Sequence, residues 1–109
     1  MARANVIIQT QFAGIHCWPG CPHEEVSFLK QPHRHVFHVK VVIPVQHTDR
    51  DVEFIMKKAE IDEFIKSEIG TDIGSNSCED IALILLERFE ASYVSVLEDG
   101  ENGGEVYAD

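Results

Sequence analysis

The chain has 109 residues, 44% of them hydrophobic, which suits a single domain (1–109) with one core. Nineteen acidic residues against nine Lys and Arg give a formal net charge of −10, which argues against nucleic-acid or anionic membrane partners. No stretch approaches the roughly 20 apolar residues of a membrane span, and the N-terminus leads directly into strand-like sequence. We therefore expect a cytoplasmic protein without a signal peptide.

The first half of the chain predicts two long β-strands joined by a loop. Residues 5–13 are rich in strand-forming residues, and His16 falls on the same alternation beyond Gly14. Residues 17–31 contain two prolines and are long for a simple hairpin connection, which is typical of functional loops. The second strand begins at Pro32 and runs to about residues 44–46.

The second strand carries two histidines at the mouth of an apolar face. Side chains alternate between faces along a strand, so His33 and His35 point the same way. The same face continues with apolar residues at alternate positions, namely Phe37, Val39, Val41, Ile43 and Val45. Two imidazoles in this setting favour a metal ion, although ordinary hydrogen bonds at a sheet end remain the alternative.

The second half of the chain predicts two helices followed by two strands. Apolar residues at helical spacing place a helix over residues 55–67, and a capping signal at Asn76 or Ser77 starts a second helix over residues 78–90. The second helix is apolar over more than half its circumference, so we expect more than one neighbour to bury it. Residues 93–98 and 105–107 predict two strands around a glycine-rich turn.

The order β-β-α-α-β-β indicates an α+β fold in which a four-stranded antiparallel sheet carries both helices on one face. Such a sheet leaves exposed edges and one uncovered face. Proteins commonly protect edges by pairing them with another subunit, so we expect a homo-oligomer.

Five segments, in this order, resemble the 6-pyruvoyl-tetrahydropterin synthase and 6-carboxy-tetrahydropterin synthase family over nearly the whole chain. The segments are residues 12–16 (Phe-Ala-Gly-Ile-His), 32–35 (Pro-His-Arg-His), 52–57 (Val-Glu-Phe with Lys57), 76–82 (Asn-Ser-Cys-Glu-Asp-Ile-Ala) and 94–98 (Val-Ser-Val-Leu-Glu). They resemble the family's Phe-x-Ala-x-His, His-Gly-His, Val-Asp-Phe-Gly-x-Leu-Lys, Pro-Thr-Ser-Glu-Asn and Val-x-Val-x-Glu motifs.

The resemblance implies the family's fold, the T-fold, in which several subunits build a barrel with sites at their interfaces. It also implies that His16, His33 and His35 are the three ligands of a zinc ion. Glu98 would be the acidic group that receives N–H donors of a pterin- or purine-like heterocycle.

The chain departs from the family at its acid–base residues. Leu29 stands where the family has its catalytic cysteine, and the connection between the two helices lacks the family's Leu-Asp-His segment. We therefore expect that the standard synthase acid–base set is not kept. Candidate replacements are a nucleophilic Cys17 or Cys21 and an acid–base pair of His47 and Asp49.

Cys17 and Cys21 allow a second interpretation, because with His23 they form Cys-x₃-Cys-x-His, a possible competing zinc cluster. The sequence thus predicts a zinc-binding, T-fold-like protein that binds a small heterocycle between subunits. Two functional classes stay open. One is a zinc-dependent lyase of the pterin synthase type, and the other is a non-catalytic ligand-binding homologue that keeps only fold and metal. A purely structural zinc is a third, lesser alternative.

Overall fold

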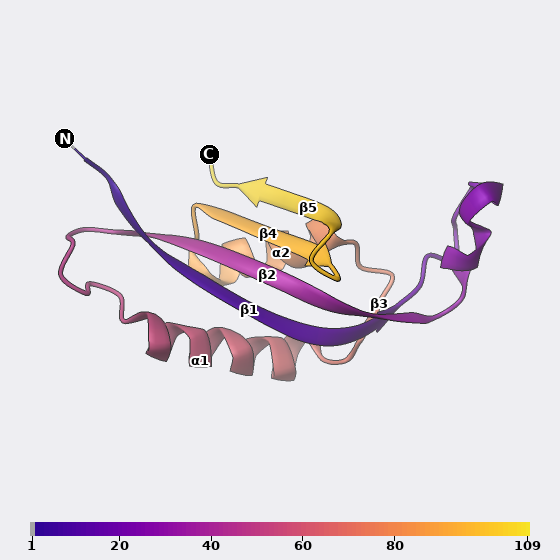
Figure 1. Cartoon of the computed structure of the whole chain (residues 1–109), viewed down its shortest axis with the longest axis horizontal. Helices are drawn as coiled ribbons and strands as arrows, with labels where there is room; N and C mark the ends of the chain where they lie inside the picture. The colour runs from indigo at the N-terminus through magenta and orange to yellow at the C-terminus, as the bar shows by residue number, and fades with distance from the viewer. Residues whose placement is uncertain (1) are drawn as a thin grey trace.

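The computed structural model describes residues 2–109, which form a long curved sheet with two α-helices packed against it (Figure 1). The strands are β1 (Ala4–His16), β2 (His33–Val45), β3 (Asp72–Gly74), β4 (Tyr93–Glu98) and β5 (Asn102–Tyr107). The helices are the 3-10 helix η1 (Glu24–Lys30), α1 (Phe54–Phe64), the π-helical turn η2 (Ile65–Ile69) and α2 (Cys78–Phe89). Within this range, no helix combines the length and apolarity needed to cross a bilayer.

The sheet has the strand order β3-β1-β2-β4-β5. β1 and β2 pair antiparallel over their whole length, from Ala4 opposite Val45 to His16 opposite His33. β3 runs parallel to β1, so the sheet is mixed. The α+β class is confirmed, whereas the predicted four-stranded antiparallel sheet is wrong by one short strand. β3 was not predicted, because a strand of three residues is too short to show a recognisable alternation of apolar and polar side chains.

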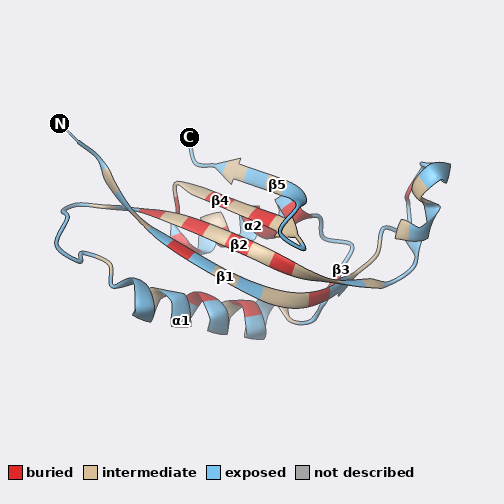
Figure 2. Cartoon of the chain, viewed as in Figure 1, coloured by how far each residue is buried: buried red, intermediate tan, exposed pale blue. Residues whose placement is uncertain are grey.

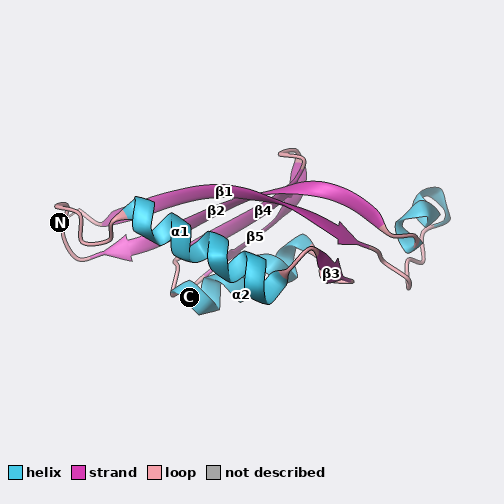
Figure 3. Cartoon of the chain, turned by 90° about the horizontal axis from the view of Figure 1, so that it is seen from below, coloured by secondary structure: helices cyan, strands magenta, loops and turns pink. Residues whose placement is uncertain are grey.

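Both α-helices lie on the same face of the sheet (Figure 3), as expected, and contribute to one core. α1 packs against β1, and α2 packs against β4 and β5. The buried residues concentrate in the middle of the sheet and on the helix sides facing it (Figure 2). The largest fully buried side chains are Phe37, Val41, Ile61, Ile81, Leu85, Val94 and Val96.

The two helices begin at clear caps. The carboxylate of Glu53 accepts the N–H groups of Ile55 and Met56 at the start of α1. Ser77 and Asp80 form a reciprocal capping box at the start of α2, which decides between the predicted alternatives. α2 has more than one neighbour, as the sequence predicts, since it packs against β4, β5 and β2. Its Leu83 and Ile84 nevertheless keep 46% and 38% of their surface exposed, because one side of α2 does not meet the sheet.

Residues 17–32, which we call the arm, project from one end of the sheet (Figure 1). The N–H of Trp18 donates to the carbonyl of Leu29 at 2.6 Å and closes the arm at its base. Cys21 is buried within the arm, while η1 has no buried residue. The arm therefore contributes little to the main core and lies beside the ends of β1 and β2.

Candidate metal centre

Three histidines from two neighbouring strands meet at the arm end of the sheet. His16 ends β1 and lies opposite His33, the first residue of β2, while His35 lies opposite Gly14. One ring nitrogen from each histidine lies within 4.8 Å of the others. In the range 2–109 these three form the only group of three or more metal-binding side chains that close together. The structure therefore brings His16, His33 and His35 together, while metal binding by them stays a prediction.

The short strand β3 fixes the end of β1 that carries His16. The N–H of Ile15 donates to the carbonyl of Thr71 at 2.7 Å, and the N–H of Cys17 donates to that of Gly74 at 3.0 Å. The pairing with β3 shifts register between Ile15 and His16, so the β1–β3 ladder is irregular at the candidate ligand. The two hydrogen bonds lie on either side of His16 and fix its backbone.

Phe37 forms the apolar floor of the histidine cluster. Its ring is fully buried and stacks on Phe12 with a centroid distance of 5.2 Å. His16 and His35 meet the same ring edge-on at 5.4 and 6.1 Å. Edge-to-face packing of this kind limits the orientations that both imidazoles can take.

The outer nitrogens of two rings are held by oxygen atoms. His33 Nδ1 lies 2.8 Å from the carbonyl oxygen of Gln31, and His35 Nδ1 lies 2.7 Å from Oδ2 of Asp99. An oxygen acceptor at Nδ1 places the proton there and leaves the Nε2 lone pair free. The Nε2 atoms of His16 and His33 are buried without a hydrogen-bond partner among the described residues. Such orphaned acceptors are unusual in a folded protein, and a cation would satisfy them.

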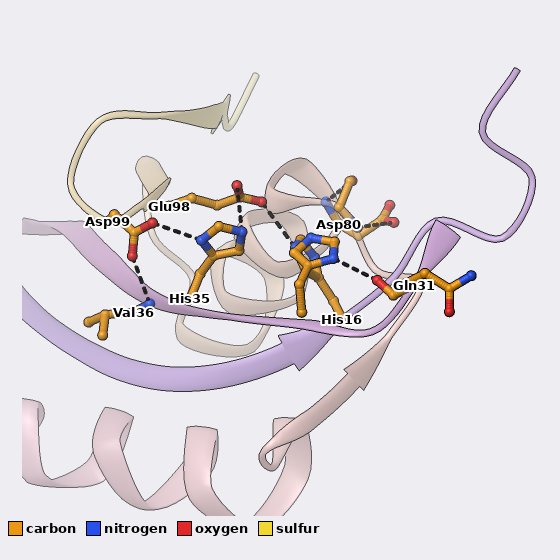
Figure 4. Close-up of polar contacts among 9 residues, drawn as sticks. His16, Gln31, His35, Val36, Asp80, Glu98 and Asp99 are labelled. Atoms are coloured by element: carbon orange, nitrogen blue, oxygen red, sulfur yellow. Dashed lines mark hydrogen bonds and ion pairs between the residues drawn. The ribbon is translucent and has the colours of Figure 1, made fainter. Parts of the chain in front are cut away.

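Glu98 lies beside the cluster, opposite Phe37 in the pairing of β2 and β4. Its carboxylate oxygens lie 3.2 Å from His16 Nε2 and 3.5 Å from His35 Nε2 (Figure 4). The contact with His16 is a close approach without hydrogen-bond alignment, since the same Nε2 has no hydrogen-bond partner. Burial lowers the pKa of His16 below its usual 6.5, while the charge of Glu98 opposes this shift. His16 is therefore neutral at neutral pH, as a metal ligand must be.

A cavity of about 500 Å³ opens on the cluster. His16, His33 and Glu98 form one wall, and the start of α2 forms another. The remaining lining residues come from the base of the arm, the entry to α2 and the β4–β5 turn: Cys17, Trp18, Leu29, Ser75, Asn76, Ser77, Cys78, Glu79, Asn102 and Gly103. The volume lies within the roughly 300–1,000 Å³ of small-molecule sites.

The three cysteines occupy different environments. Cys17 lines the cavity, as a nucleophile would have to. Cys21 is only 4% exposed, and its S–H points to the carbonyls of His23 and Val26 at 3.7 and 3.8 Å, so it holds the arm together. Burial raises the pKa of Cys78 to about 11, which keeps it a thiol. The competing cluster of Cys17, Cys21 and His23 is not formed among the described residues.

His47 and Asp49 lie beyond the end of β2 that is remote from His33 and His35. The N–H of Asp49 donates to His47 Nδ1 at 3.2 Å, but the carboxylate nearest to His47 Nε2 is that of Asp51, at 3.5 Å. Asp49 accepts instead from Arg50. Within one chain the structure does not bring this pair to the histidine cluster, so a catalytic contribution stays a prediction that requires a neighbouring subunit.

Asp99 is the residue that sequence reasoning missed. It touches both His35 and the N–H of Val36, at 2.7 and 3.1 Å. The available signal was an acidic residue directly after Glu98, at the end of a strand. That signal was insufficient because the pairing of β4 with β2 joins residues about 60 positions apart.

Comparisons with known proteins do not assign the chain to a family. No protein-family model matches the chain, and a search of curated proteins finds no match. The resemblance to tetrahydropterin synthases therefore rests on the five segments named above, and the case for function rests on the geometry of the site.

Proposed function

We propose that the protein binds a zinc ion through His16, His33 and His35 and holds a small, flat, nitrogen-rich heterocycle beside it. The observation that supports this most is the pair of buried, partnerless Nε2 atoms on His16 and His33 within a three-histidine cluster. Zinc accepts imidazole nitrogens readily, and three protein ligands leave one coordination position open. When bound, zinc would act as a Lewis acid on the group in that position.

Glu98 is the proposed anchor for the heterocycle. Its carboxylate borders the cavity and can accept two N–H groups from an aminopyrimidine edge of a pterin or purine. The same carboxylate lies 3.2 Å from His16 Nε2 and 3.5 Å from His35 Nε2, so a heterocycle bound to it would lie next to the metal. The family resemblance points to the same residue, so two independent lines favour it.

We propose further that the protein is a homo-oligomer, with the T-fold barrel as the expected assembly. β3 pairs only with Ile15 and His16, so the rest of that edge of β1 has no neighbouring strand among residues 2–109. The radius of gyration is 15.3 Å, against about 13 Å for a compact domain of this size. Phe54, Ile55 and Met56 are also more than half exposed, at 57, 70 and 72%. An open edge, an elongated shape and exposed apolar side chains together favour association with further copies.

Two residues at the cavity bear on whether the site is catalytic. Leu29 lines the cavity at the position where the family resemblance implies a catalytic cysteine. The absence of a thiol at this position favours a non-catalytic binding protein. Cys17 lines the same cavity, which favours a zinc-dependent lyase with an altered set of proton donors. The assay below separates these two candidates by turnover.

The test begins with the zinc content of freshly purified protein and of three variants. We expect about one zinc per chain, lost in His16→Ala and His33→Ala but retained in His23→Ala, which would remove a ligand of the competing arm cluster. Size-exclusion chromatography with light scattering checks that the oligomer survives. Zinc retained by His16→Ala, or absent from wild-type protein offered zinc at micromolar concentration, would contradict the proposal.

The zinc-loaded protein is then incubated with dihydroneopterin triphosphate, and substrate loss is followed. Turnover that disappears in Cys17→Ala supports the lyase and that residue's part in it. Pterin binding without turnover, lost in Glu98→Gln, supports the non-catalytic binder. Failure to bind any pterin or purine would remove the heterocycle from the proposal while leaving the zinc site standing.

A further inference from the structure

Asp99 connects the β4–β5 turn to the histidine cluster through both of its carboxylate oxygens. Oδ1 accepts the N–H of Val36 at 3.1 Å, and Oδ2 lies 2.7 Å from Nδ1 of His35 (Figure 4). The backbone N–H of Asp99 also donates to the carbonyl of Val36 at 2.7 Å. Three contacts thus hold this residue against β2, next to His35 of the cluster.

The contact with Asp99 determines which nitrogen of His35 carries the proton. Oδ1 of Asp99 already accepts the Val36 N–H, and a carboxylate oxygen is a hydrogen-bond acceptor, so the 2.7 Å contact of Oδ2 requires a proton on His35 Nδ1. With the proton at Nδ1, the neutral ring offers its lone pair at Nε2. Nε2 is the atom that faces Glu98 and the cluster.

The other two rings are placed differently. Nδ1 of His33 lies 2.8 Å from the backbone carbonyl oxygen of Gln31, which is present whatever side chain residue 31 carries. His16 approaches the carboxylate of Glu98 through Nε2, at 3.2 Å. Among the three histidines of the cluster, His35 is the one whose Nδ1 is hydrogen-bonded to a side chain, so a single substitution can change that partner.

We propose that Asp99 is a positioning residue of the metal centre, which holds His35 in the tautomer and orientation that a metal needs. The inference rests on the proposed zinc site, because orientation of His35 has a function only if its Nε2 binds an ion. Carboxylates that hold metal-binding histidines in this way commonly change metal affinity by about 10- to 100-fold when removed.

Asp99→Asn gives the sharpest test because the surroundings dictate how the amide must lie. Val36 N–H needs an acceptor, so the amide oxygen faces Val36 and the NH₂ group faces His35 Nδ1. Nδ1 must then accept, and the imidazole proton moves from Nδ1 to Nε2, where it blocks metal binding. Asp99 has φ of +55°, a left-handed conformation that asparagine and glycine both tolerate, so neither replacement strains the turn.

Asp99→Gly removes the carboxylate that accepts from His35 Nδ1 and puts no hydrogen-bond donor in its place. His35 then loses its fixed orientation but can still adopt either tautomer. The proposal therefore predicts a specific ranking of zinc affinity: wild type highest, Asp99→Gly lower and Asp99→Asn lowest. A residue that merely stabilised the turn would give the opposite ranking of the two variants, because asparagine keeps the bond to Val36 and glycine does not.

The experiment measures zinc affinity by competition with a chromophoric chelator. Glu101→Gln in the same turn serves as the control, since it removes one negative charge from an exposed side chain outside the cluster. We expect Asp99→Asn to bind zinc about 10- to 100-fold more weakly than wild type. Glu101→Gln should bind like wild type. Equal affinity of Asp99→Asn and Glu101→Gln, or weaker binding by Asp99→Gly than by Asp99→Asn, would overturn the inference.

A second measurement is independent of zinc. Long-range ¹H–¹⁵N NMR of metal-free protein reports which nitrogen of His35 is protonated. We expect Nδ1–H in wild type and Nε2–H in Asp99→Asn, and an unchanged tautomer would refute the inference. If wild type binds no zinc, the proposed function fails, and the NMR result shows separately whether Asp99 sets the tautomer.

Discussion

Replacing Gly14 with alanine adds a methyl group where the structure leaves no room. The new Cβ would lie 3.0 and 3.2 Å from Cε2 and Cδ2 of Phe37, and 3.3 Å from Cε2 of Phe12. Carbon atoms normally approach to about 3.5–4.0 Å. One or both rings must therefore move by a few tenths of an ångström.

The rings cannot move freely. Phe37 has no exposed surface, and the two phenyl rings already stack on each other. His16 and His35 also contact the Phe37 ring edge-on. Displacing Phe37 therefore disturbs both the core and the support of two proposed zinc ligands.

Overpacking of this kind costs about 1–3 kcal/mol. Replacing glycine by alanine in a strand returns about 0.5–1 kcal/mol, because the unfolded chain loses freedom. The free energy of unfolding should thus fall by about 0.5–2 kcal/mol, which for a domain near 100 residues lowers the melting temperature by roughly 2–8 °C. Zinc affinity should fall in the same variant.

Thermal unfolding of metal-free protein, followed by circular dichroism, measures the effect. Gly20→Ala is the matched control, because its Cβ would meet only Nε1 of Trp18, at 4.0 Å. The control should melt at or slightly above the wild-type temperature. The double variant Gly14→Ala with Phe37→Leu should lose less stability than the two single changes added together. A Gly14→Ala protein as stable as Gly20→Ala would refute the reasoning.

Three further predictions address the caps, the turn and pH. Ser77→Ala removes the cap of α2 and should lower the free energy of unfolding by about 0.5–2 kcal/mol in denaturant titrations, whereas Ser67→Ala should change it little. Gly103→Ala would place a Cβ in collision with the carbonyl oxygen of Val96, so it should disrupt the pairing of β4 with β5 and leave little folded protein, as amide exchange or circular dichroism would show. Burial lowers the pKa of His16 in the folded state, so as the pH falls the unfolded chain takes up a proton at this residue before the folded protein does. In chelator-treated protein, the contribution of His16 to the free energy of unfolding should be fully present above about pH 6.5 and should decrease below it. An equally steep decrease in His16→Asn would contradict this.

Much of the secondary structure follows from local sequence. The strand at residues 93–98 and the helix starting at residue 78 agree with prediction at their starts, since alternation and capping are local signals. β1 extends past the predicted end at residue 13 to His16, because Gly14 serves ring packing and does not break the strand. β5 begins at Asn102, three residues before the prediction, because Gly103 and Gly104 pair with β4 although they favour turns. α1 is followed by a π-helical turn that no sequence pattern predicted.

In the candidate site too, local sequence predicts some features, while others depend on the pairing of distant strands. The spacing of His33 and His35 fixes their common face, which any strand would provide. His16 joins them because β1 pairs with β2 residue for residue, an outcome that the sequence suggested only through a family resemblance. Asp99 reaches His35 through long-range pairing of β4 with β2, and β3 fixes the end of β1 in the same non-local way. Contacts between distant positions leave no trace in a single sequence.

The closed base of the arm makes its tip a natural place to graft new sequence. The bond from Trp18 to Leu29 separates the tip from the strands that carry His16 and His33. Lengthening a loop costs only about 0.6 kcal/mol per doubling when its ends are already held together. A peptide epitope or fluorescent tag inserted in the arm beyond this bond should therefore leave the strands that carry the histidines undisturbed.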